Sequence, residues 1–263
     1  MVRTGEISLK RRAGGSMSTK IVSHFIAGYP DMEGSLETAR GLAEGGASYL
    51  EMQIPFSDPS ADGPVIENAC RLSLEKGCTV DGAMNLLKTL TTELDIPVFL
   101  MSYGNILFAR GMESMVKQAK AAGAAGLIIP DLVYGRDEGL YALGNKEGIC
   151  VVPVITPAVS ASRLKELTDL EPEWIYTALR SGITGSYTNI DETNLGLLDS
   201  LKLLKSKVMA GFGIKSPEQV RLLAPHCDAV VVGSAIVSAV TEAKKNNMPP
   251  KDAAKSIIEK LLE

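Results

Sequence analysis

The stretch YLEMQIPFSDPSADGP, residues 49–64, decides how the rest of this chain is interpreted. Its first part alternates apolar and polar residues, as a short β-strand does. Its second part is a loop rich in proline and glycine that carries Asp62. Glu51 places a carboxylate in the middle of the strand, which is unusual. A second carboxylate in the following loop suggests acid–base chemistry at the end of a barrel strand.

The alternation of strand, loop and helix repeats along the chain from residue 20. Strands are expected at residues 21–27, from residue 49, and at 97–101, 126–130, 149–155, 174–178, 208–210 and 229–232. Helices are expected at residues 36–44, 68–75, 80–94, 113–122, 137–146, 161–170, 192–205 and 216–223, from residue 233, and at 249–262. Residues 102–105 are expected to form a loop.

Eight such units are the number that closes a (β/α)8 barrel, a fold of ~250 residues. The chain has 263 residues, of which 45% are hydrophobic, so one barrel would use nearly all of it. We therefore predict the α/β class and a single-domain TIM barrel over residues 17–263. Residues 1–16 are basic and end in Gly-Gly-Ser before Met17. We exclude them from the fold as a leader or a disordered extension.

Composition excludes several other classes of protein. The net charge is −4 and the isoelectric point is near 5.4, without a basic stripe interleaved with aromatic residues, so nucleic acid is not an expected partner. No run of apolar residues approaches the ~20 that a membrane span needs, and the N-terminus lacks the hydrophobic core of a signal peptide. The four cysteines have no metal-binding spacing. We expect a cytoplasmic protein with reduced thiols and no metal site.

Glycine and serine residues follow three late strands, where many barrel enzymes bind a phosphate through backbone N–H groups and a helix N-terminus. These places are Gly185-Ser186, Gly211-Phe212-Gly213 and Gly233-Ser234. Any one of them alone fits a simple turn from strand to helix, but the three together favour a phosphate site. The long Ser, Thr and Gly-rich segment 179–191 has the length of a functional lid.

The chain resembles the tryptophan synthase alpha chain family, whose signature reads roughly L-E-x-G-x-P-F-S-D-P-x-A-D-G-P. Residues 50–64 match this signature except at Gln53, where the family usually has glycine. The later loops match as well, at residues 182–185 (GITG), 211–214 (GFGI) and 232–235 (VGSA). Tyr176 matches a family tyrosine at the end of strand six, and residues 103–105 loosely match a Tyr-x-Asn loop.

The resemblance implies cofactor-free retro-aldol cleavage of indole-3-glycerol phosphate to indole and glyceraldehyde-3-phosphate. It makes Glu51 the general acid–base. Asp62 would be the carboxylate that stabilises the developing positive indole and takes its N–H proton. The implied substrate-binding residues are Tyr176, Thr184, Gly185, Phe212, Gly213, Gly233 and Ser234. Thr184 would belong to the lid that closes over Asp62 and excludes water.

The family works with a beta chain that holds pyridoxal phosphate, in an α2β2 complex that receives the indole. Asp58 and Asn105 match positions that face this partner. Ile106 stands where proline is common, and Asp131-Leu132-Val133 lacks the family's usual proline after Asp131-Leu132. Two alternatives stay open for this reason: a stand-alone indole-3-glycerol-phosphate lyase, and a catalytically weak subunit that activates the beta chain.

Without the resemblance, each candidate residue also has a structural interpretation. Glu51 could be a hydrogen-bonded barrel carboxylate, Asp62 a turn residue before Gly63, and Thr184 a loop residue. The two histidines are His24 and His226. We interpret His24, near the end of the first strand, as a core histidine rather than a substrate contact, and His226 as a helix-end or loop residue.

Overall fold

Strands and helices alternate along the chain in the computed structural model, which describes residues 19–179 and 190–263. The strands there are β1 (Ile21–Ile26), β2 (Tyr49–Gln53), β3 (Val98–Met101), β4 (Gly126–Ile128), β5 (Cys150–Val152), β6 (Val154–Ile155), β7 (Trp174–Ala178), β8 (Lys207–Gly211) and β9 (Ala229–Val232). The helices there are α1 (Met32–Glu44), α2 (Pro64–Glu75), α3 (Val80–Glu93), α4 (Gly104–Arg110), α5 (Met112–Ala121), α6 (Leu140–Glu147), α7 (Ala161–Leu170), α8 (Glu192–Leu201), α9 (Pro217–Leu223), α10 (Ser234–Lys245) and α11 (Pro250–Leu262).

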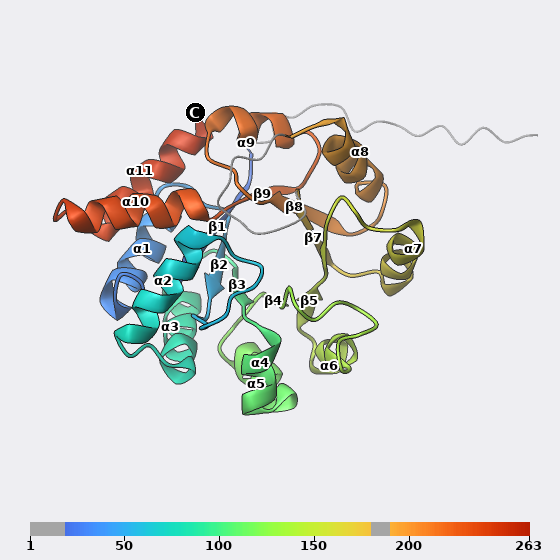
Figure 1. The fold of residues 1–263 in the computed structure, drawn as a ribbon, viewed down its shortest axis with the longest axis horizontal. Helices are drawn as coiled ribbons and strands as arrows, with labels where there is room; N and C mark the ends of the chain where they lie inside the picture. Colours follow the sequence, from blue (N-terminus) through green and yellow to red (C-terminus); the bar gives the residue numbers. More distant parts are fainter. Residues whose placement is uncertain (1–18, 180–189) are drawn as a thin grey trace, which may run out of the picture.

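The strands form one sheet with the order β5-β4-β3-β2-β1-β9-β8-β7-β6, and every pairing in it is parallel. Its two ends, β5 and β6, are consecutive pieces of one chain segment separated by Pro153. The first piece pairs with β4 and the second with β7, and the Tyr176 amide donates to the Pro153 carbonyl at 2.9 Å. The ring of strands therefore closes through this segment, and the predicted TIM barrel is confirmed. Figure 1 looks into the barrel, with the helices outside the strands.

Local sequence explains where several elements begin. The Asp31 side chain accepts the Gly34 amide at 2.8 Å and caps α1, and Ser216 caps α9 in the same way. Asp191 and Asn194 form a reciprocal capping box at the start of α8. Gly211 lets β8 lie against β9, because a Cβ there would come within 2.6 Å of the Val231 Cβ. These signals set where α1, α8 and α9 begin and how closely β8 approaches β9.

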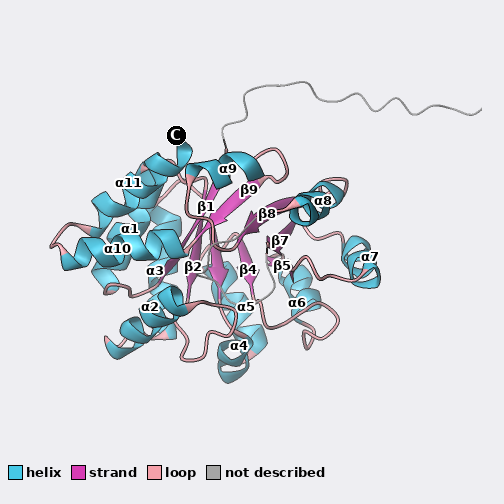
Figure 2. Cartoon of the chain, turned by 45° about the horizontal axis from the view of Figure 1, so that its top comes forward, coloured by secondary structure: helices cyan, strands magenta, loops and turns pink. Residues whose placement is uncertain are grey.

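Helix α11 extends the ring by packing against α1 and α10 (Figure 2). The backbones of α1 and α11 approach so closely that a Cβ on Gly41 would lie 2.1 Å from the Lys251 carbonyl oxygen. Ala254, Ile258 and Leu261 bury the inner face of α11. The expected C-terminal helix is therefore part of the packed structure.

The inside of the barrel holds two layers of side chains on the same strands. At the N-terminal ends of the strands, Tyr49, Phe99 and Trp174 form what we call the aromatic layer. The Trp174 ring meets the other two rings edge-on, with centroids 5.2 and 5.7 Å away. The Lys207 ammonium lies 5.2 Å from the Trp174 ring centroid. Two residues further along these strands come Glu51, Met101 and Tyr176, which face a cavity.

Several expected boundaries were wrong, and four of them have a clear cause or a large shift. Helices α1 and α2 begin at Met32 and Pro64, four residues before the predicted starts, because Asp31 and Gly63 act as N-caps. Helix α8 ends at Leu201 rather than at residue 205. The strand predicted at residues 149–155 is divided at Pro153, which has no N–H to donate.

The loop predicted at residues 102–105 is also wrong. It contains the start of α4 at Gly104, whose amide donates to the Asp131 carboxylate at 2.9 Å and 3.1 Å. No helix in residues 19–179 or 190–263 has the length and apolarity to cross a membrane. The predicted extension at residues 1–16 lies outside the described residues, as do residues 180–189 of the predicted lid.

Candidate active site

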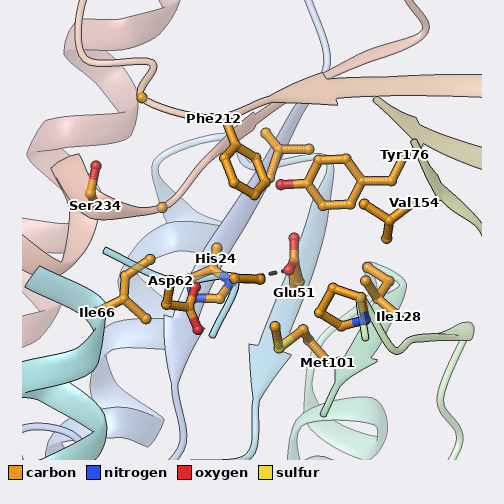
Figure 3. Close-up of a pocket in the computed structure, with 15 residues that line it drawn as sticks. His24, Glu51, Asp62, Ile66, Met101, Ile128, Val154, Tyr176, Phe212 and Ser234 are labelled. Atoms are coloured by element: carbon orange, nitrogen blue, oxygen red, sulfur yellow. Dashed lines mark hydrogen bonds and ion pairs between the residues drawn. The ribbon is translucent and has the colours of Figure 1, made fainter. Parts of the chain in front are cut away.

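A cavity opens at the carboxyl ends of the strands. It brings together seven residues that the sequence marked as functional: Glu51, Asp62, Tyr176, Phe212, Gly213, Gly233 and Ser234. Figure 3 shows the two carboxylates beside each other, with Tyr176 and Phe212 above them and Ser234 at the far side. Residues from β2, the loop after β2, β7, the loop after β8 and the start of α10 thus converge on one space.

Glu51 lies on β2 with 3% of its surface exposed. Parallel pairing sets it opposite His24 of β1, and the Nδ1 atom of His24 lies 3.1 Å from Glu51 Oε1. The other oxygen, Oε2, is buried and has no hydrogen-bond partner among the described residues. Because a buried carboxylate oxygen is costly to leave without a partner, Oε2 is the atom that is free to act on a substrate.

His24 is held between the two carboxylates. Burial opposes its charged form, but the nearby charges of Glu51 and Asp62 and the hydrogen bond with Glu51 outweigh burial, so the pKa of His24 is raised. His24 is the only residue lining the cavity, among those described, whose side chain can carry a positive charge. It therefore offsets part of the negative charge that the two carboxylates bring into the site.

Asp62 is fixed by two hydrogen bonds to one of its oxygens. The Gln53 amide nitrogen and the Tyr103 hydroxyl both donate to Asp62 Oδ2 at 2.8 Å. Tyr103 in turn accepts the Ala61 amide at 3.2 Å and stacks on Phe56, which ties the loop to the start of α4. These two donors therefore hold the Asp62 carboxylate in place beside the cavity.

The pKa of Asp62 is raised, because burial penalises its charged form more than His24, Gln53 and Tyr103 stabilise it. The pKa of Tyr103 is also raised, first by burial and then by the neighbouring Asp62 charge. Tyr103 therefore keeps its proton and remains a donor to Asp62. The loop after β2 therefore holds the Asp62 carboxylate in a fixed position, and the surrounding groups stabilise its negative charge only in part.

The walls of the cavity are apolar. Met101, Ile128 and Val154 line one side, and Phe212 meets Tyr176 edge-on with ring centroids 6.2 Å apart. Burial, followed by the charges of Glu51 and Asp62, raises the pKa of Tyr176 well above its ordinary value, so its hydroxyl stays neutral. A flat aromatic ligand with one polar edge fits these walls, because its faces would meet apolar side chains and its polar edge a carboxylate.

The far end of the cavity is made of backbone. Gly213 has a φ of 76° and Phe212 a φ of 102°, so the chain turns sharply after β8. Gly233 and Ser234 bring the N-terminal end of α10 to the cavity, and this end has no side-chain cap. Helix N-termini and glycine turns of this kind present N–H groups to an anion. This end of the cavity can hold a phosphate.

Of the four remaining predicted residues, the structure describes two. Asp58 and Asn105 do not line the cavity; both are exposed, in the loop after β2 and near the start of α4. Thr184 and Gly185 lie outside the described residues. No cluster of potential metal ligands occurs in the described part of the chain.

Three polar residues of the site were not predicted to act in it. His24 was interpreted as a core residue, Gln53 was noted only as a departure from the family signature, and Tyr103 only as part of a matching loop. His24 points to the inside of the barrel, as Val22 on the same strand does. The signal that could have been used is a histidine on β1, because β1 is the neighbour of the strand that carries Glu51. Nothing local in the sequence links Tyr103 to Asp62, 41 residues away.

Comparison with known proteins agrees with this geometry. Residues 12–261 match the model of the family described as tryptophan synthase alpha chain. The tryptophan synthase alpha chain of Helicobacter hepaticus is 39% identical over 244 residues, covering 89% of this chain and 90% of that protein. That of Carboxydothermus hydrogenoformans is 33% identical, covering 94% and 92%.

Solved structures give the same result. A chain of Mycobacterium tuberculosis tryptophan synthase superposes with a TM-score of 0.83 at 26% identity, covering 93% of this chain and 91% of that chain. A mutant tryptophan synthase alpha-subunit from Pyrococcus furiosus also gives 0.83, at 30% identity and with coverage of 93% and 98%. The chain therefore belongs to the tryptophan synthase alpha chain family.

Proposed function

We propose that this chain cleaves indole-3-glycerol phosphate into indole and glyceraldehyde-3-phosphate, with Glu51 and Asp62 as the catalytic residues. Membership of the family makes the chain a lyase of tryptophan biosynthesis. The observation that carries the residue assignment is the pair of buried carboxylates, 3% and 7% exposed, that face one apolar cavity. The helix N-terminus of α10 lines the same cavity at its far end.

The substrate would lie with its indole ring between the apolar walls and its phosphate at the backbone of residues 212–213 and 233–234. The glycerol chain would then cross the cavity near Glu51. Phosphate would gain hydrogen bonds from backbone N–H groups and the favourable end of the α10 dipole. Tyr176 would close the cavity above the ring as a neutral hydroxyl group.

Cleavage needs two proton transfers at the bond that breaks. Protonated Glu51 first gives its proton to indole C3, which places a positive charge on the indole nitrogen. The ionised Glu51 then takes the proton of the adjacent glycerol hydroxyl. The electron pair of the carbon–carbon bond returns to the ring, and the hydroxyl carbon becomes the aldehyde. Glu51 ends protonated, as it began, so the cycle balances.

Asp62 would accept the indole N–H through Oδ1 while Gln53 and Tyr103 hold Oδ2. Its negative charge would balance the positive charge that C3 protonation creates. Because the cavity is largely apolar, this interaction would be stronger than it is in water. The developing charge in the transition state then benefits more than the neutral substrate does.

A beta chain is the proposed partner, in an α2β2 complex that receives the indole. Asp58, in the loop after β2, and Asn105, in the first turn of α4, support this because both are exposed in segments that follow strands, on the same side of the barrel as the cavity. Phe108 and Val133, 48% and 41% exposed, add apolar surface near them. The steps above move only protons and one electron pair, so they need no cofactor in this chain. Pyridoxal phosphate would belong to the beta chain.

The stand-alone lyase remains the second candidate. It is favoured by Val133, which is exposed in a loop where the resemblance leads one to expect proline.

The cytoplasm is the proposed location, supported by the four cysteines, all of which are free thiols.

Indole release by the purified chain tests the proposed function. The assay would supply indole-3-glycerol phosphate to the chain alone and then with a tryptophan synthase beta chain. We expect slow release alone and a sharp rise with the beta chain, because docking would complete the site. Fast release that the beta chain does not change would favour the stand-alone lyase. No release in either condition would contradict the proposal.

A further inference from the structure

His24 is a buried histidine that the reaction as written above does not use. The residue is 5% exposed and lines the same cavity as Glu51 and Asp62. Its Nδ1 atom meets Glu51 Oε1 at 3.1 Å, while its Nε2 atom is buried without a hydrogen-bond partner among the described residues. A buried histidine with one nitrogen on a proposed catalytic carboxyl needs an explanation beyond core packing.

We propose that His24 is a positioning residue for Glu51, donating its Nδ1 hydrogen to Oε1 so that every proton transfer takes place at Oε2. This inference rests on the proposed function, because it assumes that Glu51 exchanges protons with the substrate. It assigns a role to the Nδ1 hydrogen in both states of Glu51. When Glu51 is ionised, only His24 can donate in this pair. When Glu51 is protonated, the occupied Oε1 leaves Oε2 as the site of the proton.

The surroundings keep the His24 ring in this place. Parallel pairing aligns His24 directly with Glu51. On another side, a Cβ built on Gly233 would lie 3.3 Å from the Cδ2 atom of the ring, a tight contact, so the start of α10 passes close to the ring. The ring is therefore bounded by β2 and by the proposed phosphate-binding backbone. Figure 3 shows it behind Asp62 with the dashed contact to Glu51.

Charge gives a second reason for a histidine here. The ionisable groups that face His24 are Glu51 on β2, Asp62 in the following loop and the neutral Tyr176 on β7. Two carboxylates in one small apolar space repel each other and are costly to desolvate. The raised pKa of His24 favours a positive ring between them. An apolar side chain of similar size would fill the space but neither direct the Glu51 proton nor offset this charge.

Kinetics of three variants test the proposal. We expect His24→Phe to lower kcat for indole release ~10- to 100-fold with KM changed less than about twofold, since a misplaced catalytic group costs rate more than binding. His24→Asn keeps an N–H donor near the Nδ1 position and should recover part of the lost kcat. His226→Phe is the matched control, because His226 pairs with Asp199 outside the cavity and should leave kcat unchanged.

Glu51→Gln, assayed in parallel, separates failure of this inference from failure of the proposed function. An active Glu51→Gln variant would reject the role of Glu51 itself. An inactive Glu51→Gln variant together with a His24→Phe variant at the wild-type kcat would reject the role of His24 alone. A His24→Asn variant no better than His24→Phe would also contradict the proposal, because the donor would then be irrelevant.

A spectroscopic measurement covers the case in which His24→Phe does not fold. The chain has two histidines, so nitrogen-15 NMR of wild-type protein and His226→Phe assigns the His24 ring directly. We expect a hydrogen on Nδ1 at neutral pH and a changed Nδ1 signal in Glu51→Gln. A His24 ring with hydrogen only on Nε2 would overturn the proposal.

Discussion

The aromatic layer and the cavity that holds Glu51 and Asp62 lie two residues apart on the same strands, and they have opposite characters. On β2, Tyr49 packs into the aromatic layer and Glu51 faces the cavity. On β7, Trp174 packs into the aromatic layer and Tyr176 faces the cavity. The lower layer is filled by interlocking rings, whereas the upper one holds buried polar atoms that lack partners among the described residues. We infer that the lower layer supplies stability and the upper layer chemistry.

The difference has a physical basis. Aromatic pairs add about 0.5–1.5 kcal/mol beyond the burial of their surface, so the lower layer is stabilising without any polar partner. Buried carboxylates are costly unless they are fully paired, and the upper layer leaves Glu51 Oε2 without a partner among the described residues. A substrate could supply that missing partner. If this comparison is right, substitutions in the two layers should affect different measurements.

Trp174→Ala should have the largest effect, and on stability alone. Removing this ring, which is 4% exposed, should lower the free energy of unfolding by about 4 kcal/mol, as large-to-small changes in cores do. Denaturant unfolding followed by circular dichroism measures it. Leu203→Ala is the control, because Leu203 is 88% exposed and should change stability by less than about 0.5 kcal/mol. Equal losses in both variants would refute the stabilising role of the layer.

Asp62→Asn should act on the chemistry instead, lowering kcat ~100-fold through the lost charge at the indole nitrogen. Its effect on stability should depend on pH. Because burial raises the pKa of folded Asp62, wild-type protein has the full benefit of protonated Asp62 at low pH and loses it as pH rises through the folded pKa. The variant should therefore gain stability relative to wild type as pH rises above about 4, the ordinary pKa of an aspartate.

Unfolding followed by fluorescence of the single tryptophan, Trp174, measures this difference at each pH. A difference in stability that is constant over this range would contradict the direction given for the pKa of Asp62.

Tyr103→Phe should have an intermediate effect, reducing kcat/KM about tenfold, because Asp62 Oδ2 would keep only the Gln53 donor. Tyr29→Phe is a matched control. Tyr29 is also buried, and its hydroxyl bonds to Thr241 at 2.7 Å outside the cavity. We expect this control to lose some stability but no activity. If both variants lose kcat/KM equally, the clamp on Asp62 has no specific role.

Lys207→Met should have the smallest effect, a loss of about 0.5–1 kcal/mol in stability from the contact with the Trp174 ring. Lys207 also pairs with Glu173 at 3.2 Å, so Glu173→Gln provides the comparison. That exposed pair should contribute less than the ring contact does. Thermal unfolding of the two variants compares them directly, and a larger loss in Glu173→Gln would assign the effect to the ion pair.

Much of the fold was predictable, because strand and helix signals in this chain are local. Apolar runs placed the eight strand segments, and Ser216-Pro217 marked the start of α9. The start of α4 was missed because Gly104 in a Tyr-Gly-Asn sequence is typical of a loop, and its amide is satisfied by Asp131, 27 residues away. The break at Pro153 depends on which strands each half joins, which no local pattern specifies.

The site was predictable where a motif carried it and not where packing did. Glu51 and Asp62 lie in one recognisable segment, and the glycines of the late loops follow their strands directly. The contacts of His24 with Glu51 and of Tyr103 with Asp62 depend on strand register and on a loop that folds back over the barrel. The two histidines show this: His24 contacts Glu51 in the cavity, whereas His226 contacts Asp199 near the surface.

The separation of chemistry from stability is tested most directly in Glu51→Gln, by measuring kcat for indole release and the free energy of unfolding on the same preparation. Glutamine keeps an oxygen that can accept from His24 but cannot exchange protons. We predict a loss of kcat of ~1000-fold with a free energy of unfolding equal to or above that of wild type. A kcat near wild type, or a lost kcat accompanied by a comparable loss of stability, would contradict the account.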